Sequence, residues 1–306
     1  MSITICTEQA AKLIGPKVAK KLNNWAPDKI KLLAPPKTLA DDTTKLLLTD
    51  HNERPLAVMI CGITEFTNLA FRNAERANQV REKLHGDEKL VVLEPLDFGY
   101  TEDINYAVWP YAKPLSNHTP FFQIQKIAMR GKILPWLRNA TQQTIETPSS
   151  EELYTSFISP LTKLTAEPEL DSIVKSKIEN ILKRIESENW KPLFSLAHND
   201  LWIGNVLNTT NNKYRISVID WAGAQAKGQS IFDLVKICID LKVTGKKYSS
   251  EISQTCKILD CSIEDADSYL LSSMATLFQN LEHFPKDRYF ALLKKLYNFH
   301  CANKAG

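Results

Sequence analysis

Residues 196–234 have the sequence LAHNDLWIGNVLNTTNNKYRISVIDWAGAQAKGQSIFDL, and this stretch decides the fold. It contains the pattern His198-x-Asp200-x-x-x-x-Asn205. A predicted hairpin follows, with turn residues Thr-Thr-Asn-Asn-Lys between two short strands. The second strand is apolar and ends in an Ile-Asp pair at Asp220. The pattern therefore combines a polar loop with an acidic strand end.

Phosphoryl transfer from a nucleotide explains why these residue types are useful together. Its transition state is loose and highly charged, so the protein mainly positions groups and supplies countercharge held by a metal. One carboxylate must face the attacking hydroxyl, and Asp200 at the apex of the loop is suited to this. An amide oxygen and a second carboxylate must hold the metal, and we expect Asn205 and Asp220 to converge there. Because Mg²⁺ prefers oxygen ligands and keeps several waters, two protein ligands suffice.

Composition limits the class of protein. The chain has 306 residues, enough for one large domain or two lobes, and its 43% hydrophobic and 24% charged content excludes disordered and fibrous architectures. The 38 basic and 35 acidic residues give a net charge of +3, too small an excess to indicate a nucleic-acid partner. No apolar run approaches the ~20 residues of a membrane span. The N-terminus lacks the basic and apolar regions of a signal peptide, so we expect a cytoplasmic protein.

The six cysteines contain no Cys-x-x-Cys pair, and no histidine lies near Cys256 and Cys261 to complete a zinc site. The others are Cys6, Cys61, Cys238 and Cys301. Several lie in apolar runs, where a reduced thiol packs as a small hydrophobic group. We therefore expect free, buried thiols.

The first third of the chain alternates short apolar runs with turn residues, which predicts a small sheet with one long helix after its third strand. Strands are expected at 30–34, 45–49, 56–61, 90–99 and 104–112, and the helix at 65–84. After residue 113 helices dominate, with predicted helices at 120–142, 150–165 and 168–189 and from 231 to the end. The sequence thus predicts an α+β fold with two lobes: a small β-rich N-lobe at 1–113 and a larger, mainly helical C-lobe at 114–306.

The segments HNDLWIGNVL and VIDWAGAQAKGQSIFDL resemble the aminoglycoside phosphotransferase/choline kinase family, the small-molecule branch of the protein-kinase-like fold. The order of predicted elements extends this likeness over most of the chain. The resemblance implies that ATP is the phosphate donor, that Asp200 is the catalytic base and that Asn205 and Asp220 are Mg²⁺ ligands. It also implies that His198 orients the catalytic loop and that Asp233 braces it.

The acceptor stays open. The opening His-Asn-Asp is similar to choline and ethanolamine kinases, whereas Asp-Leu-Trp with Gly-Asn is similar to fructosamine kinases. A small-molecule hydroxyl of an amino alcohol, a sugar or an aminoglycoside is therefore expected as partner, and the oligomeric state is not predicted. A quaternary amine would need an aromatic cage. The candidate rings are Trp202, Trp221, Phe278, Phe284, Tyr289 and Tyr297.

The chain departs from the family pattern in its phosphate-binding residues. Kinase-like folds place a lysine on the third strand and pair it with a glutamate on the next helix. Leu56–Cys61 has no lysine, and no glycine lies between Gly15 and Gly62 to form a phosphate loop. Glu75 matches the expected helix glutamate. Lys45 is the nearest candidate for its partner if the strand count is wrong by one.

The strand at 104–112 resembles the hinge between the lobes of kinase-like proteins. By that resemblance the backbone C=O of Pro110 and the N–H of Ala112 would face the adenine edge. A proline at 110 loses only its N–H, so the carbonyl acceptor is retained.

Two functions from different classes follow. The first is an ATP-dependent phosphotransferase acting on a small-molecule hydroxyl. The second is a non-catalytic, kinase-like binding protein, a pseudoenzyme. The absent third-strand lysine favours the second, and the intact set of Asp200, Asn205 and Asp220 favours the first.

Overall fold

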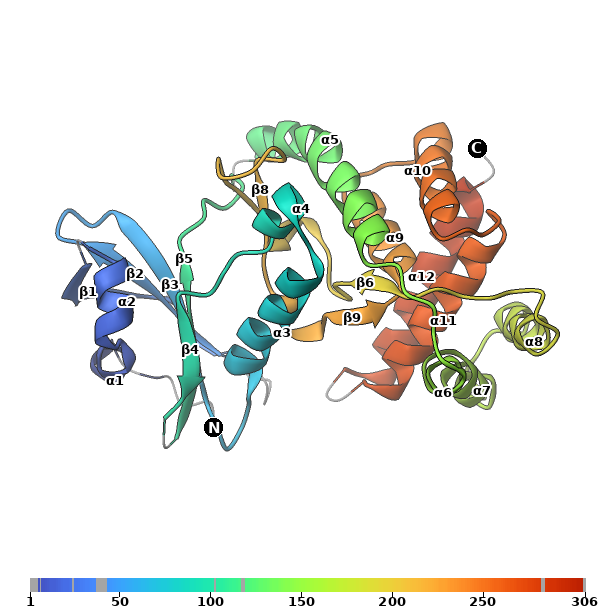
Figure 1. Cartoon of the computed structure of the whole chain (residues 1–306), viewed down its shortest axis with the longest axis horizontal. Helices are drawn as coiled ribbons and strands as arrows, with labels where there is room; N and C mark the ends of the chain where they lie inside the picture. The colour runs from blue at the N-terminus through green and yellow to red at the C-terminus, as the bar shows by residue number, and fades with distance from the viewer. Residues whose placement is uncertain are drawn as a thin grey trace. The chain divides into compact units, whose positions relative to one another are not determined.

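Figure 1 shows the computed structural model, which describes residue 5 and residues 7–23, 25–36, 43–101, 103–116, 119–281 and 284–304. The chain forms two compact units. Unit 1 comprises Met1–Leu115 and Gly204–Ala224, and unit 2 comprises Ser116–Ile203 and Gln225–Gly306. The predicted hairpin, which we expected in the C-lobe, thus belongs to the unit built mainly from the N-terminal residues.

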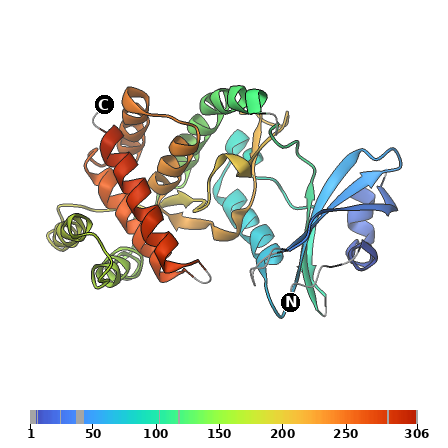
Figure 2. The ribbon, with the colours of Figure 1, turned by 180° about the vertical axis from the view of Figure 1, so that it is seen from behind.

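Unit 1 is built on a five-stranded antiparallel sheet with the strand order β1-β2-β3-β5-β4. Its strands are β1 (Trp25–Ala34), β2 (Thr44–Asp50), β3 (Pro55–Ile63), β4 (Asp97–Tyr100) and β5 (Ile104–Pro110). On one face Leu46, Leu48 and Met59 are buried with Ala10 and Val18. The last two residues come from α1 (Thr7–Leu13) and α2 (Pro16–Lys21), which lie against this face (Figures 1 and 2). The first three predicted strands are confirmed.

Helix α3 (Leu69–Lys83) is attached to the opposite face of the sheet by a buried asparagine. Asn105 lies beside Gly62 on β3, one residue from the core-facing Tyr106. Its Nδ2 donates to the carbonyls of Gly62 (2.9 Å) and Thr67 (2.6 Å), and its Oδ1 accepts from the N–H groups of Ala70 and Phe71. A helix N-terminus leaves these N–H groups without intrahelical partners. Asn105 therefore caps α3 from a neighbouring strand.

The predicted strand at 90–99 is wrong. Helix α4 (Gly86–Val91) covers its beginning, and only the short β4 follows. The acidic residues Asp87 and Glu88 occupy the first turn of α4, where a negative charge stabilises a helix. Glu88 is buried and accepts from the hydroxyl of Tyr214 and from Lys213 Nζ (3.1 Å), so tertiary contacts reinforce the helix.

The hairpin of β7 (Val206–Asn208) and β8 (Ile216–Val218) is joined to the rest of unit 1 by backbone contacts. The N–H of Asn208 donates to the carbonyl of Lys113 (2.8 Å), and Val218 forms a parallel bridge with Val92. Both predicted strands are confirmed with slightly different bounds. These contacts explain why the hairpin belongs to unit 1.

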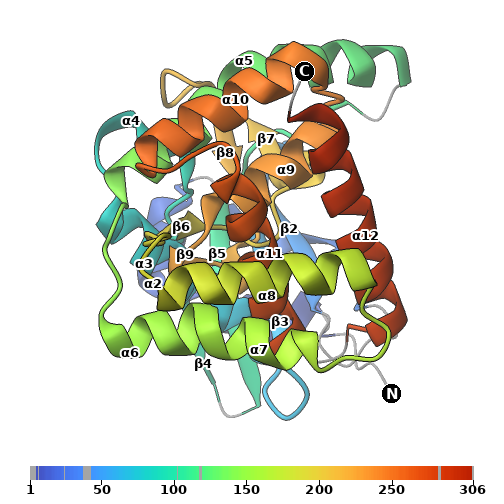
Figure 3. The same ribbon diagram turned by 90° about the vertical axis from the view of Figure 1, so that its right-hand side faces the viewer.

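Unit 2 is mainly helical, with a two-stranded sheet of β6 and β9 that sequence reasoning missed. Its elements are α5 (Thr119–Gln143), α6 (Ser150–Leu153), a π-helical turn (Tyr154–Ile158), α7 (Ser159–Thr165), α8 (Ser172–Glu186), β6 (Ser195–Ala197), β9 (Gln225–Gly228), α9 (Ser230–Asp240), α10 (Gly245–Ile258), α11 (Asp265–Gln279) and α12 (Lys286–Asn303). Figure 3 shows α8 beside α7 and α10 beside α5. The predicted helices are confirmed. A Cβ at position 228 would lie 2.5 Å from the Cβ of Ala197, so β6 and β9 can approach only with glycine there.

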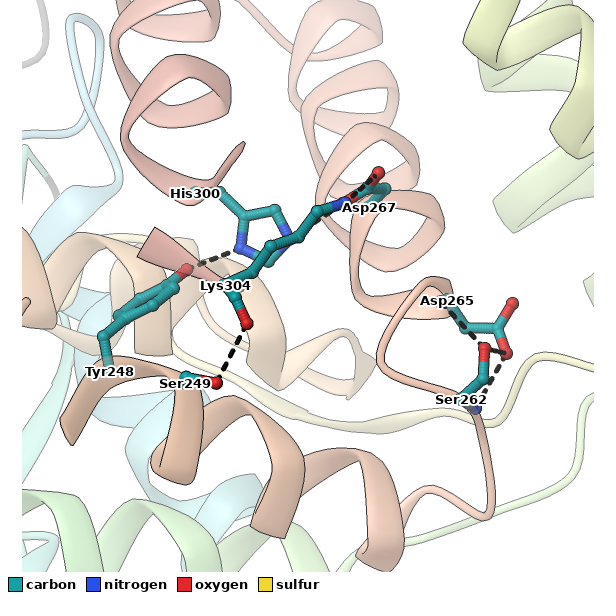
Figure 4. A network of polar contacts seen from close by, with 7 residues as sticks. All are labelled: Tyr248, Ser249, Ser262, Asp265, Asp267, His300 and Lys304. Atoms are coloured by element: carbon teal, nitrogen blue, oxygen red, sulfur yellow. Dashed lines mark hydrogen bonds and ion pairs between the residues drawn. The ribbon is translucent and has the colours of Figure 1, made fainter. Parts of the chain in front are cut away.

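A buried polar network joins α10, α11 and the end of α12 (Figure 4). His300 lies 2.6 Å from the hydroxyl of Tyr248 through Nδ1 and 2.9 Å from Asp267 Oδ1 through Nε2. Lys304 Nζ donates to both carboxylate oxygens of Asp267, at 2.5 and 2.6 Å. Burial raises the pKa of Asp267, but the bonds from His300 and Lys304 outweigh it and lower the pKa overall. The network therefore holds an ionised carboxylate in the core of unit 2.

Two sequence predictions concern general properties of the chain. Among the described residues, no helix is both long enough and apolar enough to cross a membrane. The thiols of Cys61, Cys238 and Cys256 are free and buried, as predicted. Cys301 is free but exposed, so burial was wrong there, and Cys6 lies outside the described residues.

Replacing Asn105 by alanine should lower the free energy of unfolding by roughly 2–4 kcal/mol, because several buried backbone groups lose their partners. Urea denaturation of the full chain measures this loss. Asn52→Ala is the control, since Asn52 is exposed in the β2–β3 turn and should change stability by less than about 0.5 kcal/mol. Equal stability of the two variants would show that Asn105 does not hold α3.

Candidate active site

Asp200 lies on the loop that follows β6 in unit 2. Its side chain is 55% exposed, whereas the neighbouring Leu201 and Ile203 are buried. Asn199 has the left-handed backbone conformation, with φ of 64°. Asparagine tolerates this conformation better than most residues, and it turns the chain sharply just before Asp200. The loop therefore presents a carboxylate to solvent on a short, sharply bent segment.

His198 contacts the backbone of this loop. The N–H of Asp200 donates to His198 Nδ1 (3.2 Å), and the histidine is 2% exposed. Because a backbone N–H can only donate, Nδ1 carries no proton, and the neutral ring has its proton on Nε2. This placement matches an orienting role better than that of a second proton acceptor.

Helix α9 holds the loop with three charged residues. Asp233, Lys236 and Asp240 are separated by three and four residues, so they share one face of the helix. Asp233 Oδ2 accepts from the N–H of His198 (2.5 Å), and Asp240 Oδ2 accepts from the N–H of Ile203 (3.0 Å). The two carboxylates thus bind the two ends of the loop. Lys236 lies between them and forms an ion pair with Asp200, Nζ to Oδ1 at 2.8 Å.

The carboxylate of Asp233 is completely buried. Burial raises its pKa to about 7, while the N–H groups of His198, Leu201 and Asn199 and the charge of Lys236 act to lower it. Asp233 therefore accepts a proton far more readily than an ordinary aspartate. The predicted bracing residue does contact the loop that carries Asp200.

Asn205 and Asp220 lie at the same end of the β7–β8 hairpin in unit 1. Asn205 directly precedes β7, Asp220 follows β8 by two residues, and the N–H of Ile219 donates to the carbonyl of Asn205 (3.0 Å). Asn205 is buried and Asp220 is exposed. The structure thus brings together the two residues predicted as metal ligands, and both side chains offer oxygen atoms of the kind that Mg²⁺ prefers.

The backbone at Asp220 is held in the left-handed conformation, with φ of 67° and ψ of 60°. Such a conformation costs on the order of 1–3 kcal/mol and persists only where neighbouring contacts enforce it. Two side chains of α3 do so. Asn73 Oδ1 accepts from the N–H of Trp221 (2.9 Å), and Arg76 donates to the carbonyl of Ala224. Helix α3 therefore fixes the segment that follows Asp220.

Glu75 does not take part in these contacts. It is exposed on α3, and no ion pair joins it to another described residue. The buried residues of α3 are uncharged: Ala70, Asn73, Ala74, Ala77 and Val80. Asn73 and Arg76 are the α3 residues that bind the segment after Asp220, and sequence reasoning identified neither.

Lys45 lies on β2, and the third strand is indeed β3, so the strand count was not wrong by one. Lys45 pairs directly with Ile60 of β3 and therefore shares its face of the sheet. This is the face of Asn105, which caps α3. The β3 positions on this face are Val58, Ile60 and Gly62, none of which carries a charge. Lys45 is exposed and forms no ion pair with a described residue.

The predicted hinge residues lie at the end of β5. Pro110 is the last residue of the strand and pairs with Ala57, and the N–H of Tyr111 donates to the carbonyl of Leu56 (3.0 Å). Ala112 follows, partly exposed. Their contact with adenine stays a prediction.

The aromatic candidates do not form one group. Trp221 and Tyr289 are completely buried, and the hydroxyl of Tyr289 donates to the carbonyl of Met274 (2.8 Å), so both rings are part of the core. Phe278 packs against Tyr289 at 5.1 Å between ring centroids. Trp202, two residues after Asp200, is 46% exposed.

The sequence gives no match in a scan of protein-family models, and a search of curated proteins gives none either. The structure does match solved structures. One is a thermostable mutant of an aminoglycoside phosphotransferase in ternary complex with AMP-PNP and hygromycin B, at 14% identity and a TM-score of 0.57, covering 94% of this chain and 98% of that one. Another is a choline kinase from Streptococcus pneumoniae, at 14% identity and a TM-score of 0.54, covering 95% and 99%. A third is a putative fructosamine-3-kinase from Haemophilus somnus, at 12% identity and a TM-score of 0.53, covering 92% and 95%.

The chain has the fold of the protein-kinase-like small-molecule kinases. The predicted fold class is therefore confirmed over almost the whole chain. Within this small-molecule kinase fold, the pattern His198-x-Asp200-x-x-x-x-Asn205 spans the point at which the chain passes from unit 2 to unit 1, between Ile203 and Gly204.

Sequence reasoning missed Lys236 and Asp240, although a signal was present. The segment IFDLVKICIDL is apolar except for three charged residues at helical spacing. Charges on one face of an otherwise apolar helix are rarely buried without partners. Their partners in the structure are atoms of the loop that carries Asp200.

Asp233→Asn should flatten the pH dependence of stability. Between about pH 4 and pH 7 the native state holds a proton on Asp233 that the unfolded state has released, so the free energy of unfolding falls as pH rises through this window. The slope is at most about 1.4 kcal/mol per pH unit. The asparagine keeps an acceptor oxygen for the N–H of His198, but its amide does not titrate in this pH range.

The measurement is urea denaturation of the parent and of Asp233→Asn from pH 4.5 to pH 8.5. The difference in stability between the two should change across the window and level off above about pH 7. The exposed substitution Asp287→Asn is the control and should follow the parent. Parallel curves for the parent and Asp233→Asn would show that Asp233 is ionised throughout this range.

Proposed function

We propose that the protein is an ATP-dependent phosphotransferase that acts on a hydroxyl of a small molecule. The observation that carries this proposal is the pairing of Asn205 with Asp220 at one end of the hairpin, with Asp220 held exposed in a strained backbone conformation. Strain of this kind clusters at functional sites. The fold is that of kinases whose acceptors are small molecules.

Magnesium fits the residues of this hairpin end. An amide oxygen and a carboxylate are hard donors, and Mg²⁺ bound to nucleotide phosphates needs few protein ligands. Among the described residues, no group of three or more His, Cys, Asp or Glu side chains could hold a metal by itself. When bound, the ion would neutralise charge on the phosphates.

Asp200 has the proposed role of catalytic base. It would orient the acceptor hydroxyl and take its proton as the acceptor oxygen bonds to the γ-phosphorus and the bond from that phosphorus to the β–γ bridging oxygen breaks. ADP leaves with the bridging oxygen. His198 and Asp233 support the loop, and Trp202 offers a ring beside it.

Pro110 and Ala112 are proposed to bind the adenine edge through the carbonyl and the N–H of their backbone. Glu75, exposed on α3, stays the glutamate proposed for the phosphate site, and Asn73 of the same helix binds the segment after Asp220.

The acceptor is proposed to be an amino alcohol, a sugar or an aminoglycoside. One neighbouring structure holds hygromycin B, and others are a choline kinase and a putative fructosamine-3-kinase. The protein is further proposed to be cytoplasmic. Phosphate or ADP release from Mg-ATP with choline, ethanolamine, fructose and hygromycin B would distinguish these acceptor classes.

The second candidate is a kinase-like binding protein without catalysis. The uncharged positions Val58, Ile60 and Gly62 favour it, because no lysine on β3 can hold the nucleotide phosphates. Release of ADP from Mg-ATP by the parent, and its loss without Mg²⁺, would exclude this candidate.

Two substitutions separate the proposed base from the proposed metal ligands. Asp200→Asn should reduce turnover by about 10²–10⁴-fold, the usual contribution of a positioned acid or base, and leave the thermal stabilisation by Mg-ATP unchanged. Asp220→Ala should abolish both turnover and this stabilisation. Asp220 is exposed, so the variant should still fold. Full turnover of Asp200→Asn would contradict the mechanism, and normal Mg-ATP binding by Asp220→Ala would contradict the metal site.

Lys45 is proposed to replace the missing lysine of the third strand, because it lies opposite Ile60 on the same face. Lys45→Ala should weaken ATP binding and slow turnover together, each by about 10-fold or more, as expected when a hydrogen bond to a charged group is lost. The matched control is Lys31→Ala. Lys31 shares this face of the sheet through its pairing with Leu47, but it already binds Glu53 at 2.6 Å. Unchanged affinity and turnover in Lys45→Ala would remove Lys45 from the site.

A further inference from the structure

A lysine of α9 reaches the proposed catalytic base. Lys236 Nζ lies 2.8 Å from Asp200 Oδ1 and 3.4 Å from the carbonyl oxygen of Asn199. The two side chains differ in burial: that of Lys236 is 17% exposed and that of Asp200 is 55% exposed. The ammonium group thus approaches the carboxylate from the protein interior, and the solvent side of Asp200 stays accessible.

The position of Lys236 is fixed before any ligand binds. Its Nζ lies 5.5 Å from the centroid of the Phe232 ring, one helical turn earlier, in a cation–π contact. Because α9 is a regular helix packed in the core, the start of the side chain is rigid as well. An ammonium group has three donors, and the contacts to Asp200 and Asn199 account for two of them.

Other residues bind the N–H groups of the loop. Those at its two ends are bound by Asp233 and Asp240, and His198 binds the N–H of Asp200. Lys236 adds a longer bond to the carbonyl of Asn199, and its shorter bond is to the side chain whose oxygen must face the acceptor. A buried or half-buried lysine on an apolar helix is costly unless it is paired, and here its partner is the reactive carboxylate itself.

We propose that Lys236 is the positioning residue of Asp200: its ammonium group fixes the orientation of the carboxylate toward the acceptor hydroxyl. This inference rests on the proposed function and adds a residue that the pattern His198-x-Asp200-x-x-x-x-Asn205 does not contain.

The test is the turnover of Lys236 variants of the full chain. Turnover is measured as ADP release from Mg-ATP, with whichever of choline, ethanolamine, fructose and hygromycin B the parent phosphorylates fastest. Lys236→Met keeps the aliphatic stem and removes the charge. It should lower kcat by about 10–100-fold, which corresponds to the free energy of a hydrogen bond to a charged group. The KM for ATP and the stabilisation by Mg-ATP should stay within about 2-fold of the parent. Lys236→Arg should recover most of the loss.

A double-mutant cycle distinguishes this role from a structural one. If Lys236 acts through Asp200, Lys236→Met should lower turnover by less than about 3-fold in the Asp200→Asn background, because the two residues work as a unit. Lys257→Met is the matched control in unit 2, where the lysine is exposed on α10, and it should leave kcat unchanged. If Lys236→Met does not fold, Lys236→Gln is measured under the same criteria.

The outcomes separate the two hypotheses. Two results would overturn the role of Lys236 alone, provided that the parent transfers phosphate. One is an unchanged kcat in Lys236→Met. The other is a decrease in kcat by Lys236→Met that is as large in the Asp200→Asn background as in the parent. A parent that releases no ADP with any of the four acceptors contradicts the proposed function. In that case the positioning role falls with it, since no reaction exists for Asp200 to serve.

Discussion

The buried carboxyl group of Asp233 is the constraint on which the loop that carries Asp200 depends. A carboxyl group removed from water is strongly destabilising unless it is hydrogen-bonded. In unit 2 the donors are the backbone N–H groups of His198, Asn199 and Leu201. Together with the bonds from the N–H of Ile203 to Asp240 and from the N–H of Asp200 to His198, they fix the course of the segment that carries Asp200.

In unit 1 the segment after Asp220 is likewise held by side chains of one helix, α3. An irregular segment leaves backbone groups unpaired, and they must find partners nearby. After Asp220 these partners come from α3, through Asn73 and Arg76. Helix α3 is itself capped by Asn105 from β5. Asn105 is therefore connected to the position of Asp220 through one helix, although 115 residues separate the two in the sequence.

The sequence was informative where local chemistry decides the structure. The alternating residues of β2 and β3 and the hairpin before Asp220 have local signals, and they were predicted correctly. The strand expected at 90–99 was not, because Glu88 gains its stabilising partners from residues 213 and 214, far along the chain. The same holds for Asn73 and Lys236. Their spacing within a helix was visible, but their partners became known only when the chain was folded.

The chain departs from the pattern of kinase-like folds at the contact between β3 and α3, where β3 carries no lysine. A lysine on β3 without an acidic partner on α3, or the reverse, would leave a lone charge at a half-buried position, which is more destabilising than having neither. On this face of β3, Val58, Ile60 and Gly62 are uncharged; the buried residues of α3 are uncharged as well, and Glu75 lies exposed on α3. The uncharged strand fits a binding protein without catalysis, whereas the strained backbone of Asp220 beside Asn205 fits the proposed phosphotransferase. Under that proposal the positive charge that β3 lacks would come from another residue of unit 1, and Lys45 on the neighbouring strand is the proposed one.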